Sequence, residues 1–110
     1  MLFLEQEGKT MALIAYTDEN ECDFAVNILR KRDVKKAIKL INEGVTAWYR
    51  AAWDGREPIE PTENYSAEEI EGFYGAGYAE PSLWLLEKFK IPHRLVRLEE
   101  ISEKDVNIWI

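Results

Sequence analysis

Apolar residues near the start of the chain fall in two short runs. Leu2–Leu4 and Thr10–Tyr16 lie on either side of a polar connection that contains Gly8. Short apolar runs separated by a polar, glycine-containing connection are typical of a β-hairpin with a longer loop. The pattern therefore predicts two N-terminal strands.

A helical pattern follows these strands. Asp18 and Glu21 have the three-residue spacing of a capping box, in which both side chains accept hydrogen bonds from backbone N–H groups at the start of a helix. Val26 and Leu29 would then share one face of that helix. We expect the helix to run from Asp18 to about Arg32.

A longer helix is expected after Asp33. The apolar positions from Val34 to Ala52 follow the three-four spacing of a buried helical stripe. Gly44 leaves an alternative open, because glycine can end a helix and Val45–Trp53 is rich in residues that favour strands. We favour a single helix that passes through Gly44.

Two further helices are predicted from their first residues. Gly55 and the prolines that follow it indicate a surface loop after the long helix. Ser66 and Glu69 form a second capping-box pattern, which predicts a short helix. Pro81 suits the first turn of another helix, and Pro92 stops it.

The end of the chain returns to strand patterns. Leu95–Leu98 is a short apolar segment, and Val106, Ile108 and Ile110 recur at every second position. The predicted fold class is therefore α+β, in a single domain over residues 1–110. Its small, mostly antiparallel sheet has two N-terminal and two C-terminal strands, and it packs against a block of about four helices.

The composition narrows the class of protein. The chain has 110 residues, of which 46% are hydrophobic, so it can bury a core without disulfides. Cys22 is the only cysteine, which excludes an intrachain disulfide and favours a reducing compartment. No apolar stretch approaches the roughly 20 residues that span a bilayer. We expect a cytoplasmic protein that does not enter membranes.

Charge is distributed unevenly along the chain. The net charge is −7, and the acidic residues are concentrated between residues 54 and 71. Residues 30–39 contain six basic residues: Arg30, Lys31, Arg32, Lys35, Lys36 and Lys39. Nucleic-acid binding through these six is an alternative function, although overall acidity opposes attraction to phosphates. Pairing of the opposite charges between copies would give a homo-oligomer.

The familiar catalytic and cofactor motifs each lack a necessary residue. No serine lies in a G-x-S-x-G or comparable setting that would pair it with His93, the only histidine, so a Ser-His triad is not expected. One histidine and one cysteine cannot supply the usual ligand set of a transition metal. Gly77 is followed by tyrosine where a P-loop needs lysine, and Asp18–Asp23 lacks the glycine of a calcium loop. We expect no metal and no cofactor. A small enzyme with a carboxylate-dependent site is a further alternative, carried by Glu68, Glu69 and Glu71.

Aromatic residues gather in the middle of the chain. Eight of the thirteen lie between Trp48 and Trp84, and the acidic segment adjoins them. We expect Trp48 and Phe73 in the core and others at the surface, where tyrosine and tryptophan suit interfaces. The favoured function is a non-enzymatic protein-interaction module whose aromatic patch has an acidic rim and binds a protein partner of basic character. Its candidate contact residues are Tyr49, Trp53, Tyr65, Tyr74 and Tyr78.

Overall fold

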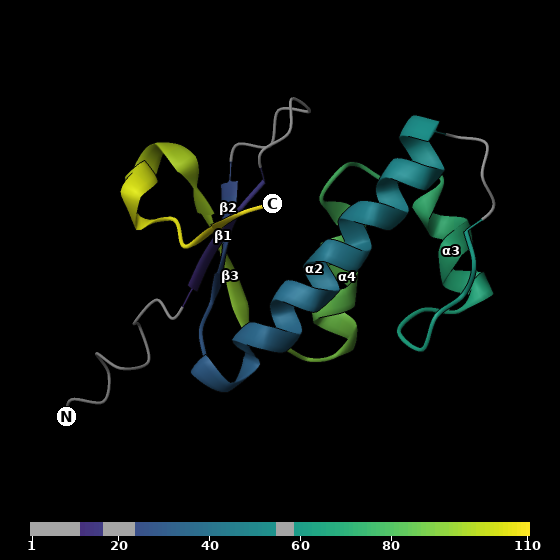
Figure 1. Ribbon diagram of the computed structural model, residues 1–110, viewed down its shortest axis with the longest axis horizontal. Helices are drawn as coiled ribbons and strands as arrows, with labels where there is room; N and C mark the ends of the chain where they lie inside the picture. The colour runs from purple at the N-terminus through teal and green to yellow at the C-terminus, as the bar shows by residue number, and fades with distance from the viewer. Residues whose placement is uncertain (1–11, 17–23, 55–58) are drawn as a thin grey trace. The chain divides into compact units, whose positions relative to one another are not determined.

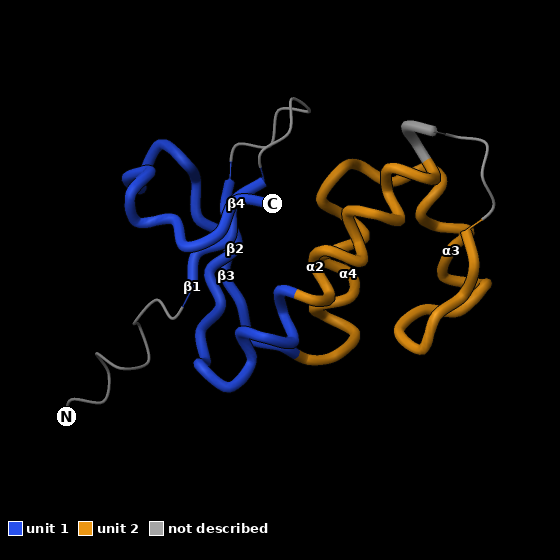
Figure 2. Tube along the Cα trace, in the orientation of Figure 1, with its two compact units in different colours: residues 1–38, 91–110 blue, residues 39–90 orange. Residues whose placement is uncertain are grey.

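A computed structural model describes residues 12–16, 24–54 and 59–110 of the chain, without the side chains of 52–54 (Figure 1). Contacts divide the chain into two compact units (Figure 2). Unit 1 comprises Met1–Ile38 and Ile91–Ile110, and unit 2 comprises Lys39–Lys90. The first holds the described sheet, and the second holds helices.

Unit 1 contains a four-stranded mixed sheet with the order β3-β2-β1-β4. β1 (Ala12–Ala15) and β3 (His93–Arg97) both pair antiparallel with β2 (Phe24–Ile28). The short β4 (Ile108–Trp109) pairs parallel with β1. The sheet is thus mostly antiparallel, as expected, with one parallel pair.

The strand β2 corrects the prediction of a helix from Asp18 to Arg32. Phe24–Ile28 is a strand, and Ala25, Val26 and Ile28 are fully buried. A strand buried on both faces is a nearly continuous apolar run, interrupted here by Asn27, and sequence periodicity cannot distinguish such a run from a buried helical segment. The predicted cap at residues 18 and 21, and the predicted first strand at 2–4, lie outside the described residues.

The C-terminal strands are confirmed, although the last is short. Leu95 lies in β3 and Ile108 in β4. Before β4 the backbone forms a tight turn, in which the N–H of Val106 donates to the carbonyl of Glu103 (3.1 Å). Val106 then packs on an apolar cluster that includes Leu13. This turn shortens the alternating segment to a two-residue strand.

Unit 2 is helical. Its elements are most of α2 (Val34–Trp48), a π-helical segment (Tyr49–Asp54), α3 (Ala67–Phe73) and α4 (Glu80–Lys88). The helix through Gly44 is confirmed, since α2 continues to Trp48. The described residues hold three α-helices, against the four or so expected, because Phe24–Ile28 is a strand.

The starts of α3 and α4 follow their sequence signals. Ser66 Oγ accepts from the N–H of Glu69 (3.2 Å), and the Glu69 carboxylate accepts from the N–H of Ser66 (2.8 Å). This reciprocal pair is the predicted capping box. Pro81 lies in the first turn of α4, where its missing N–H costs nothing. Both helices begin where the sequence places them.

Gly44 explains how α2 and α4 approach each other within unit 2. A Cβ atom at Gly44 would lie 2.5 Å from both the Cα and the backbone nitrogen of Ser82. The Ser82 hydroxyl, itself fully buried, donates to the carbonyl of Ile41 (3.1 Å). The glycine is therefore required for backbone contact between the two helices.

Candidate functional site

The aromatic residues of unit 2 form an inner cluster. Trp48 is 8% and Phe73 is 2% exposed, which confirms that both belong to the core. The Trp48 indole donates to the carbonyl of Ala76 (3.0 Å) and meets the Tyr78 ring edge-on, with 5.0 Å between centroids. Tyr65 packs edge-on against Phe73 at 5.2 Å. These contacts hold four of the eight clustered rings inside the unit.

The five predicted contact residues divide by exposure. Tyr49 is 36% and Tyr74 is 45% exposed. Tyr65 and Tyr78, at 8% and 6%, are largely buried. The side chain of Trp53 lies outside the described part of the structure. Among the four members whose side chains are described, Tyr49 and Tyr74 are therefore the ones with exposed rings.

A hollow between α3 and α4 joins aromatic and acidic side chains, and we call it the α3–α4 groove. Its volume is about 320 Å³. The Trp84 ring lies nearly parallel to the Phe73 ring, with 6.1 Å between centroids and 21° between planes. Trp84 is 41% exposed, whereas Phe73 is buried beneath it. The lining residues are Glu68, Glu69, Gly72, Phe73, Trp84 and Leu85.

Helix periodicity explains why Trp84 lines a surface hollow. The buried residues of α4 are Pro81, Ser82, Leu85 and Leu86, so Trp84 lies off the buried stripe. On α3, Gly72 has no side chain to fill the space: a Cβ there would be 3.7 Å from Cζ3 of Trp84. A glycine opposite a large ring leaves the groove open.

The two carboxylates of the groove differ in their partners. Glu69 is paired with Lys88 (2.8 Å), and it also caps α3. The hydrogen bond from Lys88, followed by that from the Ser66 backbone, lowers the pKa of the Glu69 carboxyl. Glu68 is exposed and has no ion pair within the described part of the chain. Glu68 is thus the carboxylate available to an incoming cation.

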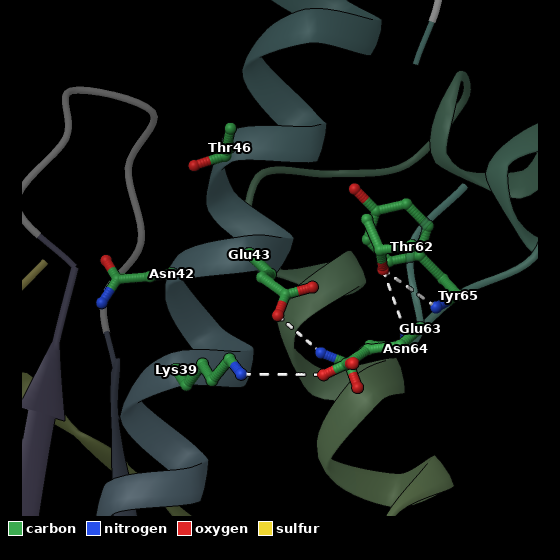
Figure 3. A pocket seen from close by; sticks show the side chains of 8 residues that line it. All are labelled: Lys39, Asn42, Glu43, Thr46, Thr62, Glu63, Asn64 and Tyr65. Carbon is green, nitrogen blue, oxygen red and sulfur yellow. Dashed lines mark hydrogen bonds and ion pairs between the residues drawn. The ribbon is translucent and has the colours of Figure 1, made fainter. Parts of the chain in front are cut away.

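A second, wider hollow of about 640 Å³ lies between α2 and the loop 62–65 (Figure 3). Thr62 Oγ1 accepts from the N–H of Asn64 (3.0 Å), and the buried Asn64 amide donates to the Glu43 carboxylate. Burial, together with the nearby charge of Glu43, raises the pKa of Tyr65. This arrangement anchors the loop to α2. Its lining mixes amides, hydroxyls and both signs of charge: Lys39, Asn42, Glu43, Thr46, Thr62, Glu63, Asn64 and Tyr65.

The basic residues of the alternative nucleic-acid interface are all exposed: Arg30, Lys31, Arg32, Lys35, Lys36 and Lys39. Arg30 is paired with Asp33 at 2.8 Å, and Lys39 lies 3.8 Å from Glu63. Three of the remaining basic residues, Lys31, Arg32 and Lys35, line an open hollow of about 690 Å³ together with Val34. The structure therefore brings half of the predicted basic residues to one place.

The carboxylate-dependent enzyme site is assembled only in part. Glu68 and Glu69 line the α3–α4 groove, but Glu71 does not. The groove's lining contains no histidine, cysteine or serine, which are the usual partners of a catalytic carboxylate. His93 lies at the start of β3, with Nδ1 2.8 Å from the carbonyl of Ile91. Within the described ranges, no three histidine, cysteine or acidic side chains are grouped to hold a metal ion.

Sequence reasoning missed Trp84 and Gly72 as groove residues. The sequence shows Trp84 as one of the clustered aromatic residues. Its exposure follows only from which face of α4 is buried, and that face contains Pro81 and Leu85. In the sequence, Gly72 stands out only as part of a glycine-rich stretch.

Within the described residues, none of the helices has the length and apolar character that a membrane-spanning segment needs. Comparisons with protein-family models, curated proteins and solved structures gave no match for this chain.

Proposed function

We propose that this chain is a non-enzymatic protein-interaction module that binds a basic segment of a partner protein through the α3–α4 groove. The observation that carries the proposal is the exposed Trp84, stacked on the buried Phe73 in the same hollow as Glu68, whose carboxylate has no ion pair with any residue that the structure describes. A large ring held from below by another ring is a rigid anchor, and such anchors dominate binding energy at protein interfaces.

Electrostatics favours a basic partner. The chain carries a net charge of −7, and α3 has acidic residues in its first turn at Glu68 and Glu69. Acidic surfaces attract basic ones during diffusional encounter and fix the register of the bound state. Tyr74, the residue that follows α3, is a further exposed aromatic residue of unit 2.

The proposal is tested with a fluorescently labelled peptide in which arginine and lysine alternate with serine. Trp84→Ala should weaken its binding by about thirtyfold or more, because truncation of an interface anchor costs about 2 kcal/mol or more. Trp109→Ala is the matched control, since Trp109 is 45% exposed but belongs to unit 1. Glu68→Lys should weaken binding too, with the fold verified by circular dichroism. Equal affinity of all three variants and the wild type would reject the groove as the binding surface.

A second candidate function is nucleic-acid binding through the basic residues. The observation that favours it is the gathering of Lys31, Arg32 and Lys35 around one hollow, without ion pairs in the described part of the chain. Binding to a single-stranded oligonucleotide should then weaken with salt, and Lys31→Glu plus Lys35→Glu should lower the salt slope by about 0.7 for each lysine. Absence of a gel shift at low salt would remove this candidate.

A further inference from the structure

We propose that the α3–α4 groove is a side-chain pocket for a single arginine of the partner and selects arginine over lysine. This inference rests on the proposed function, because it names the chemical group that the same groove receives. Three properties of the groove lead to it: its size, the carboxylate of Glu68 and the exposed indole ring of Trp84 in its lining.

The size of the groove limits what can occupy it. At about 320 Å³ it lies at the small end of the roughly 300–1,000 Å³ range of ligand pockets. That space suits one long side chain rather than a helix or a folded loop. Leu85 and Phe73 give the groove an apolar interior, which suits the methylene stem of a long basic residue.

Among the described residues, the charges of the groove leave one carboxylate, that of Glu68, without a partner cation. The Lys88 ammonium donates to the carboxylate of Glu69 and to the carbonyl of Asn64, both at 2.8 Å. The charge of Lys88 is therefore balanced by Glu69 and is fixed in place. Glu68 contributes the remaining charge, which matches a monovalent cation.

The ring and the carboxylate together favour guanidinium over ammonium. A guanidinium is planar and weakly hydrated, so it stacks on an indole while its fork donates two parallel hydrogen bonds to a carboxylate. An ammonium is strongly hydrated and makes only point contacts. Trp84 offers the exposed ring and Glu68 the acceptor, and both line one hollow.

The experiment compares three peptides that differ at one central residue within the same serine-glycine sequence: arginine, lysine or neutral citrulline. Titration of the full chain is followed by NMR. The arginine peptide should bind at least about fivefold more tightly than the lysine peptide, and citrulline should bind weakest. Glu68→Gln should remove the preference for arginine, and Gly72→Leu should block the groove to all three peptides. Glu71→Gln is the matched control, because Glu71 is an exposed acidic residue of α3 that does not line the groove.

The outcomes separate this inference from the proposed function. Arginine preference that is lost in Glu68→Gln and kept in Glu71→Gln supports an arginine pocket. Equal binding of arginine and lysine peptides, with both lost in Gly72→Leu, overturns the selectivity while leaving the groove as the interaction surface. If binding of basic peptides is unaffected by any groove substitution, the proposed function and the inference both fail.

Discussion

At the scale of single residues, two glycines with different surroundings shape unit 2. Gly44 lies where the backbone of α4 reaches α2, and Gly72 lies opposite the Trp84 ring. In a helix interior, alanine is ordinarily favoured over glycine by about 1 kcal/mol. Whether alanine at either position stabilises the protein therefore depends on the space that is available for its methyl group.

Gly44→Ala should destabilise the protein. The added methyl would meet the backbone of Ser82 at 2.5 Å, and backbone cannot yield as a flexible side chain can. We expect a loss of about 1–3 kcal/mol, the usual cost of overpacking, measured by urea unfolding. Gly72→Ala is the matched control: its methyl would make an ordinary 3.7 Å contact with Trp84, so stability should be unchanged or slightly higher. A Gly44→Ala protein as stable as the wild type would contradict the close helix contact.

At the scale of elements, α3 depends on its first turn. The helix has seven residues and begins with the reciprocal bonds between Ser66 and Glu69. Short helices are marginal without tertiary contacts and caps. Because α3 supplies Glu68 and Gly72 to the groove, the cap supports the proposed binding surface as well as the fold.

Ser66→Ala should remove the capping bond to the N–H of Glu69 and cost about 1 kcal/mol of folding free energy. Ser102→Ala is a suitable control, since Ser102 precedes a short 3-10 turn and makes no side-chain cap. Chemical denaturation of both variants measures the difference. Equal stability of the two would show that the capping box contributes nothing.

The ion pair between Glu69 and Lys88 should give α3 a stability that depends on pH. The pKa of Glu69 is lowered in the folded chain, chiefly by the hydrogen bond from Lys88. A lowered folded-state pKa means that the contribution is complete above the unfolded pKa and disappears as pH falls through the folded value. Glu69→Gln keeps a capping residue but removes the charge. The stability difference between wild type and Glu69→Gln should therefore shrink in acid, and a difference that is constant with pH would contradict the pairing.

The elements show which parts of the fold the sequence can reveal. Ser66, Glu69 and Pro81 act through neighbouring backbone groups, so the starts of α3 and α4 are local and predictable. The strand Phe24–Ile28 is set by pairing with β1 and β3, which no local pattern contains. For the candidate site, the sequence alone shows that the middle of the chain is rich in aromatic and acidic residues. Which of these rings are exposed depends on how the helices pack, so the exposure of Trp84 could not be predicted.

At the scale of the whole molecule, the proposed site lies within one compact unit. Every residue that lines the α3–α4 groove belongs to Lys39–Lys90, whereas Lys31, Arg32 and Lys35 of the basic hollow belong to unit 1. The acidic and basic surfaces can therefore be altered independently. Association of copies through these opposite charges stays a prediction, which sedimentation at low and high salt can measure.

The most direct measurement of the central claim is an NMR titration of the isotopically labelled chain with the arginine peptide. The account predicts that backbone signals of residues 68–72 and the indole signal of Trp84 shift together along one binding curve. The signals of β1 to β4 should remain in place. Shifts confined to residues 30–39 or to the sheet, or no shift at any peptide concentration, would contradict binding at the α3–α4 groove.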